Sequence, residues 1–144
     1  MRRWAEAVPI ERRGRSRLFI APRGTSTTMR RLGEAELQHA MTGSFAAARL
    51  APVAPPRLAT IYVDTADTAR RVLDLHETDA GANVLLIEPK DASVLSAATA
   101  DEDGVRWAPL VQVVADLFTG PGRSPTEAEA LMEWMTSNEE AWRA

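Results

Sequence analysis

The most restrictive feature of the sequence is a short apolar run near its middle. Four consecutive apolar residues, at positions 84–87, lie between Asn83 and Glu88. A run of this length is typical of a strand buried on both faces, because a half-exposed strand alternates apolar with polar residues. A strand buried on both faces needs helices on each side of its sheet, so this segment predicts an α/β fold.

The rest of the chain alternates between expected strands and expected helices. Strands are predicted at 17–21, 58–64, 83–88 and 105–107, where apolar and β-branched residues lie between turn residues. Helices are predicted after a cap at Ser26 or Thr27, over 45–50, and after Thr65. This order predicts an α/β (α+β) fold with a mixed sheet of about four to five strands packed by helices.

A pair of helices is predicted at the C-terminal end. The first begins at Pro109 and carries apolar residues at 110, 113, 114 and 117, which match the 3.6-residue period. The second begins with Ser124 as N-cap, Pro125 at the first position and Glu127 completing a capping box. We expect one broad face of this last helix to pack into the core, and that face holds Leu131, Trp134, Met135 and Trp142.

Length and composition narrow the class of protein. The 144 residues fit one domain of common size, which we divide into a basic entry segment at 1–16 and a single α/β domain at 17–144. The chain has no cysteine, which excludes disulfides, thiolate metal sites and cysteine nucleophiles. No apolar run approaches the roughly 20 residues of a membrane span. The charged N-terminus does not resemble a signal peptide, so a cytoplasmic location is expected.

Basic residues are concentrated at the start of the chain. Residues 1–31 carry a net charge of +7, whereas the remaining residues carry −10. Four arginines fall close together, and these are Arg12, Arg13, Arg15 and Arg17. They are candidates for contacting DNA, weakly and without sequence preference, because phosphate contacts give affinity without reading bases. The alternatives are a solvated linker and a face that pairs with acidic residues of this chain.

Residues that carry catalysis are sparse. The two histidines, His39 and His76, have no second ligand at i+3 or i+4, so no catalytic site, metal site or cofactor is predicted. The acidic group at 101–103 is interpreted as a solvated loop. Asp116 lies within the apolar segment 113–118. It is interpreted as a carboxylate bonded to a neighbouring turn, with a functional role as the alternative.

Two turns that precede helices are candidates for binding an anion or a partner. They comprise Thr42, Gly43 and Ser44 in one, and Gly120, Gly122 and Arg123 in the other. Free N–H groups at the start of a helix can bind an anion. Neither turn has the lysine and the spacing of a phosphate-binding P-loop. A tight turn that caps a helix is therefore the simpler interpretation of each.

Several segments together resemble the C-terminal domain of the AbiEi-type antitoxins. They are the segments 39–47, 51–58, 61–63 and 83–89, followed by Pro109, Gln112, Asp116 and Leu117 before the turn at 120–123. The resemblance implies an α/β domain that follows a winged-helix DNA-binding domain in a regulator of a type IV toxin–antitoxin system. By the same resemblance, residues 1–7 match the end of the linker after the winged helix, so the DNA-reading element is expected to be missing here.

These observations together favour a non-enzymatic antitoxin or regulator domain that acts through protein contacts. The resemblance implies a partner that is either a nucleotidyltransferase-like toxin or a DNA-binding subunit, and a second copy of the chain is a further alternative. A different class, a small nucleotide- or phosphate-handling enzyme that uses the two turns, lacks an accompanying general base, metal cluster or lysine. A structural assembly partner is the third alternative.

Overall fold

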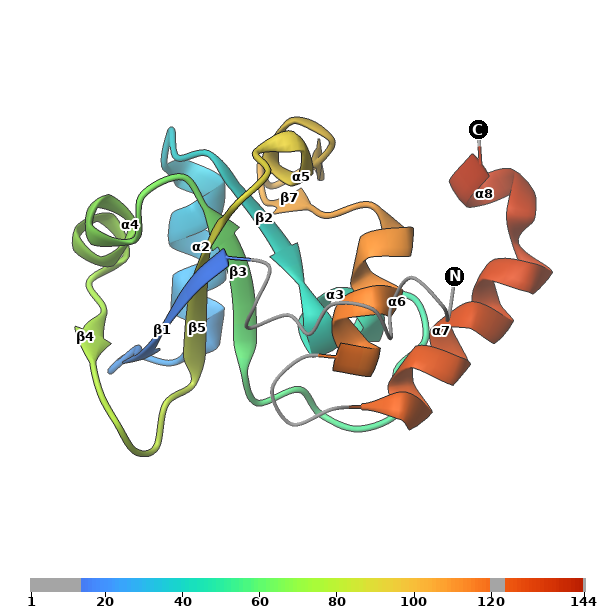
Figure 1. Ribbon diagram of the computed structural model, residues 1–144, viewed down its shortest axis with the longest axis horizontal. Coiled ribbons are helices and arrows are strands. Elements are labelled where there is room, and N and C mark those ends of the chain that lie inside the picture. The colour runs from blue at the N-terminus through green and yellow to red at the C-terminus, as the bar shows by residue number, and fades with distance from the viewer. Residues whose placement is uncertain (1–13, 120–123, 144) are drawn as a thin grey trace.

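The computed structural model describes residues 14–119 and 124–143, and a mixed seven-stranded sheet forms its centre (Figure 1). The strands lie in the order β4-β1-β5-β3-β2-β7-β6. Their bounds are β1 Gly14–Ile20, β2 His39–Thr42, β3 Ala59–Val63, β4 His76–Glu77, β5 Val84–Pro89, β6 Thr99–Ala100 and β7 Arg106–Trp107. The pairs β3–β5 and β2–β7 are parallel and the other pairs are antiparallel. The predicted mixed α/β (α+β) class is confirmed.

The helices lie on the two faces and at one end of this sheet. Their bounds are α2 Thr25–Glu34, α3 Gly43–Ala48, α4 Ala66–Leu73, α5 Ser93–Ser96, α6 Leu110–Thr119, α7 Pro125–Ser137 and α8 Glu139–Arg143. In Figure 1, α2 runs behind the strands, whereas α3, α6 and α7 gather beyond β2. The register of β2 against β3 places Thr42 beside Thr60 and Ala40 beside Tyr62. These four residues therefore share one face of the sheet, because side chains alternate along a strand.

The burial of β5 confirms the predicted strand that is covered on both faces. All four residues from Val84 to Ile87 are at most 3% exposed, and β3 beside it is buried along its whole length. Parallel strands in the middle of a sheet are covered on both faces, which explains why their residues do not alternate.

The sheet has more strands than the four to five predicted from the sequence. The strands β4 and β6 have two residues each, too few to show a period. The strand β2 was missed because its four residues, His39 to Thr42, are all buried and include two that are polar. The first strand also begins at Gly14, three residues before the predicted start at Arg17. Short or fully buried strands leave little alternation for a sequence to reveal.

Several predicted helix ends differ from the structure. Gly24 occupies the N-cap of α2 with φ of 90°, so Ser26 and Thr27 lie inside the helix and do not cap it. Ser124 does occupy the N-cap of α7, and Pro125 follows it as predicted, but Ser124 makes no side-chain cap hydrogen bond. The predicted capping box is therefore wrong. The predicted end of α6 at Gly120 lies outside the described residues.

The last helix packs on a narrower face than the sequence predicted. Ala128, Leu131 and Met135 are buried, whereas Trp134 is only partly buried against the core. Trp142 lies in the separate helix α8, where its Nε1 donates to the carbonyl of Met135 at 2.7 Å. The predicted packing of Trp134 against the core is therefore confirmed, but Trp134 lies at the border of the buried stripe and not within it.

Candidate functional site

A buried polar cluster joins α6 to the sheet. Asp116 on α6 is only 2% exposed, and among the described residues its carboxyl group accepts hydrogen bonds from the side chains of Thr42, Tyr62 and Gln112. Thr42 Oγ1 donates to its Oδ2 at 2.6 Å, and Tyr62 OH lies 3.0 Å from both oxygens. Gln112 Nε2 donates to Oδ1 at 2.9 Å. Buried polar groups are stable when they are hydrogen-bonded in this way.

The sequence brings these four residues together through two periodicities. Gln112 and Asp116 lie four residues apart, on one side of α6. Thr42 and Tyr62 lie on neighbouring strands and on the same face of the sheet, as the register requires. We refer to Thr42, Tyr62, Gln112 and Asp116 as the Asp116 cluster. It ties the ends of three elements that are far apart in the chain.

The role predicted for Asp116 is confirmed in one respect and wrong in another. The carboxyl group does accept a bond from the turn at Thr42. It is not a flank residue of its helix, however, because it is buried and also binds Tyr62 of β3. The signal in the sequence was an acidic residue inside the apolar segment 113–118. Only the strand register, which the sequence did not provide, identifies Tyr62 as its partner.

The turn between β2 and α3 is packed tightly against its neighbours. Gly43 has φ of 69°, and a Cβ at this position would lie 3.3 Å from Thr60. Ser44 Oγ donates to Glu127 Oε1 of α7 at 3.0 Å, so Glu127 binds this turn and not the N-cap of its own helix. Both hydroxyls of the predicted anion-binding turn thus face carboxyl groups. The other predicted turn, with Gly120, Gly122 and Arg123, lies outside the described residues.

The predicted arginine cluster is divided by the structure. Arg12 and Arg13 lie outside the described residues. Arg15 is exposed on β1. The guanidinium of Arg17 binds Glu77 through two bonds of 3.0 Å and Asp67 at 2.9 Å. These bonds, first with Glu77 and then with Asp67, raise the pKa of Arg17. Arg17 therefore pairs with acidic residues of this chain, which was one of the alternatives to DNA contact.

His39 is a structural residue of the sheet. It is 1% exposed, its Nδ1 lies 2.8 Å from the carbonyl of Leu37, and its Nε2 accepts the backbone N–H of Arg106 at 2.9 Å. These partners identify the neutral tautomer with the proton on Nδ1. Burial lowers the pKa of His39, and the nearby charge of Arg106 adds to this effect. Within the described ranges no group of three or more histidine or acidic residues is placed to hold a metal ion.

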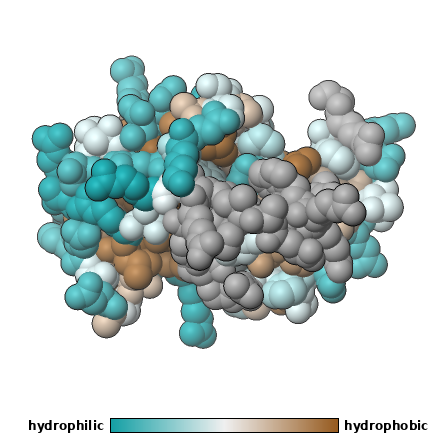
Figure 2. All heavy atoms as spheres, in the orientation of Figure 1, coloured by the Kyte–Doolittle hydropathy of each residue, from teal (hydrophilic) through white to brown (hydrophobic). Residues whose placement is uncertain are grey.

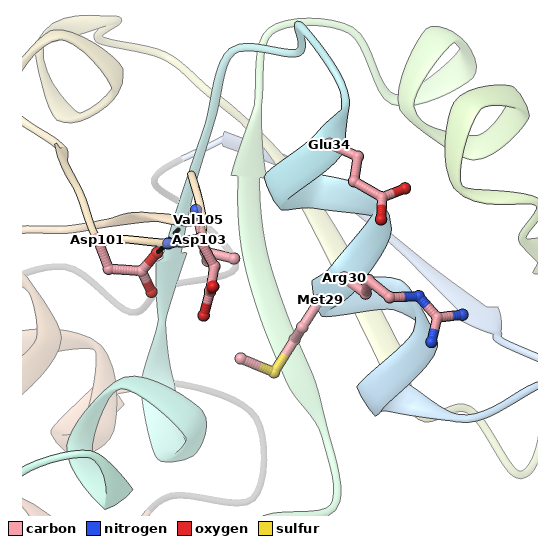
Figure 3. A pocket seen from close by; sticks show the side chains of 6 residues that line it. All are labelled: Met29, Arg30, Glu34, Asp101, Asp103 and Val105. Atoms are coloured by element: carbon pink, nitrogen blue, oxygen red, sulfur yellow. Dashed lines mark hydrogen bonds between the residues drawn. The ribbon is translucent and has the colours of Figure 1, made fainter.

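A hollow of about 490 Å³ lies between α2 and the turn at 101–105 (Figure 3). In Figure 3, Met29 extends from α2 toward Asp103, whereas Arg30 and Glu34 point away from the turn. Asp101 Oδ1 accepts the backbone N–H groups of Asp103 at 2.9 Å and of Val105 at 3.0 Å. The segment 101–103 is an exposed turn at Glu102 and Asp103, as predicted, but the prediction missed that the carboxyl group of Asp101 organises this turn.

A hydrogen bond from Trp107 contributes to the lowered pKa of Asp101. Trp107 Nε1 donates to Asp101 Oδ2 at 2.9 Å. Burial alone raises the pKa of Asp101, but the bonds from Trp107 and from the two backbone N–H groups outweigh it and lower the pKa. The signal in the sequence was an aspartate three residues before Gly104, a common pair in tight turns.

The fold and the cluster define a class of protein. It is an α+β domain with a mixed sheet, in which a buried carboxyl group joins a late helix to two strands. The chain matches a family described as transcriptional regulators, the AbiEi antitoxins of type IV toxin–antitoxin systems, over residues 1–136. It belongs to that family, as the resemblance of its motifs implied, and this membership supports an antitoxin-type role.

No curated protein matches the chain. Within the described part of the chain, the helices are too short or too polar to cross a lipid bilayer.

Proposed function

We propose that this chain acts as an antitoxin by binding a protein partner, and that it carries out no reaction of its own. The observation that carries the proposal is the family match over residues 1–136. The family implies a toxin as partner, and the finer proposal is a nucleotidyltransferase-like toxin. A DNA-binding subunit is the alternative partner. The cytoplasm, where a toxin and its antitoxin are made, is the proposed location.

The polar groups of the candidate site support binding over catalysis. A phosphate-handling enzyme would need the hydroxyls of the β2–α3 turn to face its substrate. The hydroxyl of Thr42 instead donates to Asp116, and that of Ser44 donates to Glu127. A phosphate-bearing substrate at this turn would have to displace both carboxyl groups from these hydroxyls.

Co-expression tests the proposal directly. A toxin gene adjacent to the gene of this chain is induced alone and together with the chain, and growth is measured. We expect growth to stop in the first case and to continue in the second, with toxin and chain co-purifying at physiological salt. The matched control is the chain with an early stop codon, because it leaves the messenger RNA nearly unchanged. Rescue by the control, or rescue without co-purification, would contradict the proposal.

The proposal includes a weak, nonspecific contact with DNA through the basic edge. Replacing Arg12, Arg13, Arg15 and Arg17 with glutamine should abolish retention of duplex DNA at low salt, because phosphate contacts release counterions and depend steeply on salt. The matched control replaces four other arginines, which are Arg23, Arg30, Arg57 and Arg71. Titration of labelled operator and scrambled duplexes at two salt concentrations is the measurement. A clear preference for the operator at physiological salt would refute the nonspecific mode.

A further inference from the structure

The outer edge of β1 is only partly covered by its neighbour. The strand spans Gly14–Ile20, but β4 pairs only with Phe19 and Ile20. One more bond, from the N–H of Thr78 to the carbonyl of Leu18 at 3.1 Å, extends this pairing by a single residue. From Arg17 back to Gly14, no described strand pairs with the outer edge of β1.

The direction of the peptide groups shows which atoms this edge presents. The carbonyl of Phe19 accepts the N–H of Asn83, on the side of β5, whereas the carbonyl of Leu18 faces Thr78 on the side of β4. Peptide groups alternate in direction along a strand, so Ser16, two residues before Leu18, also faces the outer side. Ser16 is exposed, and no described residue pairs with its N–H and carbonyl on this outer side, because β4 pairs only with Phe19 and Ile20 and the pairing reaches no further than Leu18. An exposed strand edge of this kind is a template for a further strand.

Apolar surface lies beside this edge. Leu18 is 38% exposed and Ile20 is 37% exposed, and they share one face of β1. A hollow of about 420 Å³ next to them has Leu18 and Leu85 as its apolar lining and Ser16, Arg17, Glu77, Thr78 and Asp79 as its polar lining. Figure 2 shows a hydrophobic area over β1 and β5, in the lower left of the view. A strand added at Ser16 would place alternate side chains over this apolar surface.

Charge on the opposite face of β1 selects the chemistry of the added strand. Arg15 and Arg17 lie on that face, but only Arg17 has carboxyl partners, Glu77 and Asp67. Arg15 is exposed and lies beside Glu88 of β5 in the strand register, but it forms no ion pair with another described residue. A second copy of the chain, paired antiparallel along this edge, would place arginines opposite one another, and like charges on opposed strands are unfavourable.

We propose that the β1 edge at Arg15 and Ser16 is a docking site for an extended segment of a partner protein that carries an acidic residue opposite Arg15 and apolar residues toward Leu18. The main-chain bonds at Ser16 supply affinity. The side chains of the added strand that face Arg15 on one side and Leu18 on the other supply specificity, as in other cases of strand addition. This inference rests on the proposed function, because it assigns the surface through which an antitoxin contacts its partner.

A pair of peptides tests the edge without the partner. The probe is a fluorescein-labelled peptide in which valine alternates with threonine, with one central glutamate on the threonine side. Its matched form carries lysine in place of the glutamate. Fluorescence anisotropy should show the glutamate peptide binding about tenfold more tightly than the lysine peptide, and hydrogen exchange at the Ser16 amide should slow on binding.

Two pairs of variants place the binding on this edge. Ser16→Pro removes the outward N–H, and proline is tolerated on an edge strand when its position faces solvent. It should abolish binding, whereas Ser16→Ala, which keeps the N–H, should bind as the unmodified chain does. Arg15→Glu should reverse the preference, so that the lysine peptide binds better than the glutamate peptide. This variant still tests the docking edge if Ser16→Pro fails to fold. Arg57→Glu, at an exposed position elsewhere, should leave the preference unchanged.

Three results would overturn the inference. They are the absence of binding by both peptides, unchanged binding in Ser16→Pro, and self-association that Ser16→Pro abolishes, since this last result makes a second copy the occupant. The co-expression assay separates the inference from the proposed function. Rescue by a folded Ser16→Pro variant rejects the docking edge and leaves the antitoxin role intact. Failure of the unmodified chain to rescue rejects the antitoxin role, while the peptide result stands by itself.

Discussion

Replacing Asp116 with alanine should destabilise the fold more than any other single change of an acidic residue. The change removes the acceptor of hydrogen bonds from Thr42, Tyr62 and Gln112, and it does so where the side chain is only 2% exposed. Each buried donor left without a partner costs about 1–3 kcal/mol, and donors that reorient recover part of this. The expected loss is about 3–5 kcal/mol, which corresponds to three buried donors that recover part of their hydrogen bonding.

Urea denaturation followed by tryptophan fluorescence measures this loss. The matched control is Asp79→Ala, an exposed acidic residue, which should change the unfolding free energy by less than about 0.5 kcal/mol. Tyr62→Phe removes one donor and should cost about 1–2 kcal/mol. Because both changes break the same bond, the double variant should lose less than the sum of the two. A loss below about 1 kcal/mol for Asp116→Ala, or additivity in the double variant, would refute the role of the Asp116 cluster.

Three further predictions address the last helix, the buried histidine and the helix cap. Leu131→Ala should cost about 2–5 kcal/mol in chemical denaturation, more than Trp134→Ala, because Leu131 is fully buried and Trp134 only partly; the reverse order would contradict this packing. Burial lowers the pKa of His39, so the folded chain takes up a proton less readily than the unfolded chain. The unfolding free energy should therefore be at its full value above about pH 6.5 and decline as the pH falls below it, and His39→Gln should flatten this decline between about pH 7 and 5. Ser124→Ala should cost less than about 0.5 kcal/mol and Glu127→Ala about 0.5–1.5 kcal/mol, as measured by thermal unfolding, because Glu127 and not Ser124 makes the side-chain bond at this helix start.

Much of the fold could be predicted from local patterns. The strand at Val84 was found because four apolar residues in a row identify a strand covered on both faces. The helix α7 was found because Ser124 and Pro125 mark a helix start. The strand β2 was not found, because its four buried residues include the polar His39 and Thr42 and so show neither alternation nor an apolar run. The edge strands β4 and β6 were not found, because two residues are too few to show a period.

Less of the candidate site could be predicted, because its hydrogen bonds join residues that are far apart in the sequence. The sequence singled out Asp116 as an acidic residue in an apolar segment and Thr42 as the start of a turn, but it gave no reason to join them. The bond between them spans 74 positions. The capping box at Glu127 failed in the same way, since the local pattern was present but Ser44, from a distant turn, took the carboxyl group. Local chemistry identifies polar groups that need partners, and the tertiary fold decides which partner each receives.

The arginines at the start of the chain show how partners provided by the tertiary fold affect function. Counting charges in the sequence treated Arg15 and Arg17 as equal members of one basic cluster. The structure separates them, because Glu77 and Asp67 compensate Arg17, whereas Arg15 is exposed beside the part of the β1 edge that no described strand covers. A phosphate backbone responds to the summed charge of a surface, whereas a strand-shaped partner responds to one cation at a defined register. The pairing of Arg17 therefore weakens the case for DNA along β1 and strengthens the case for a protein partner, since it reduces the summed charge without changing the position of Arg15.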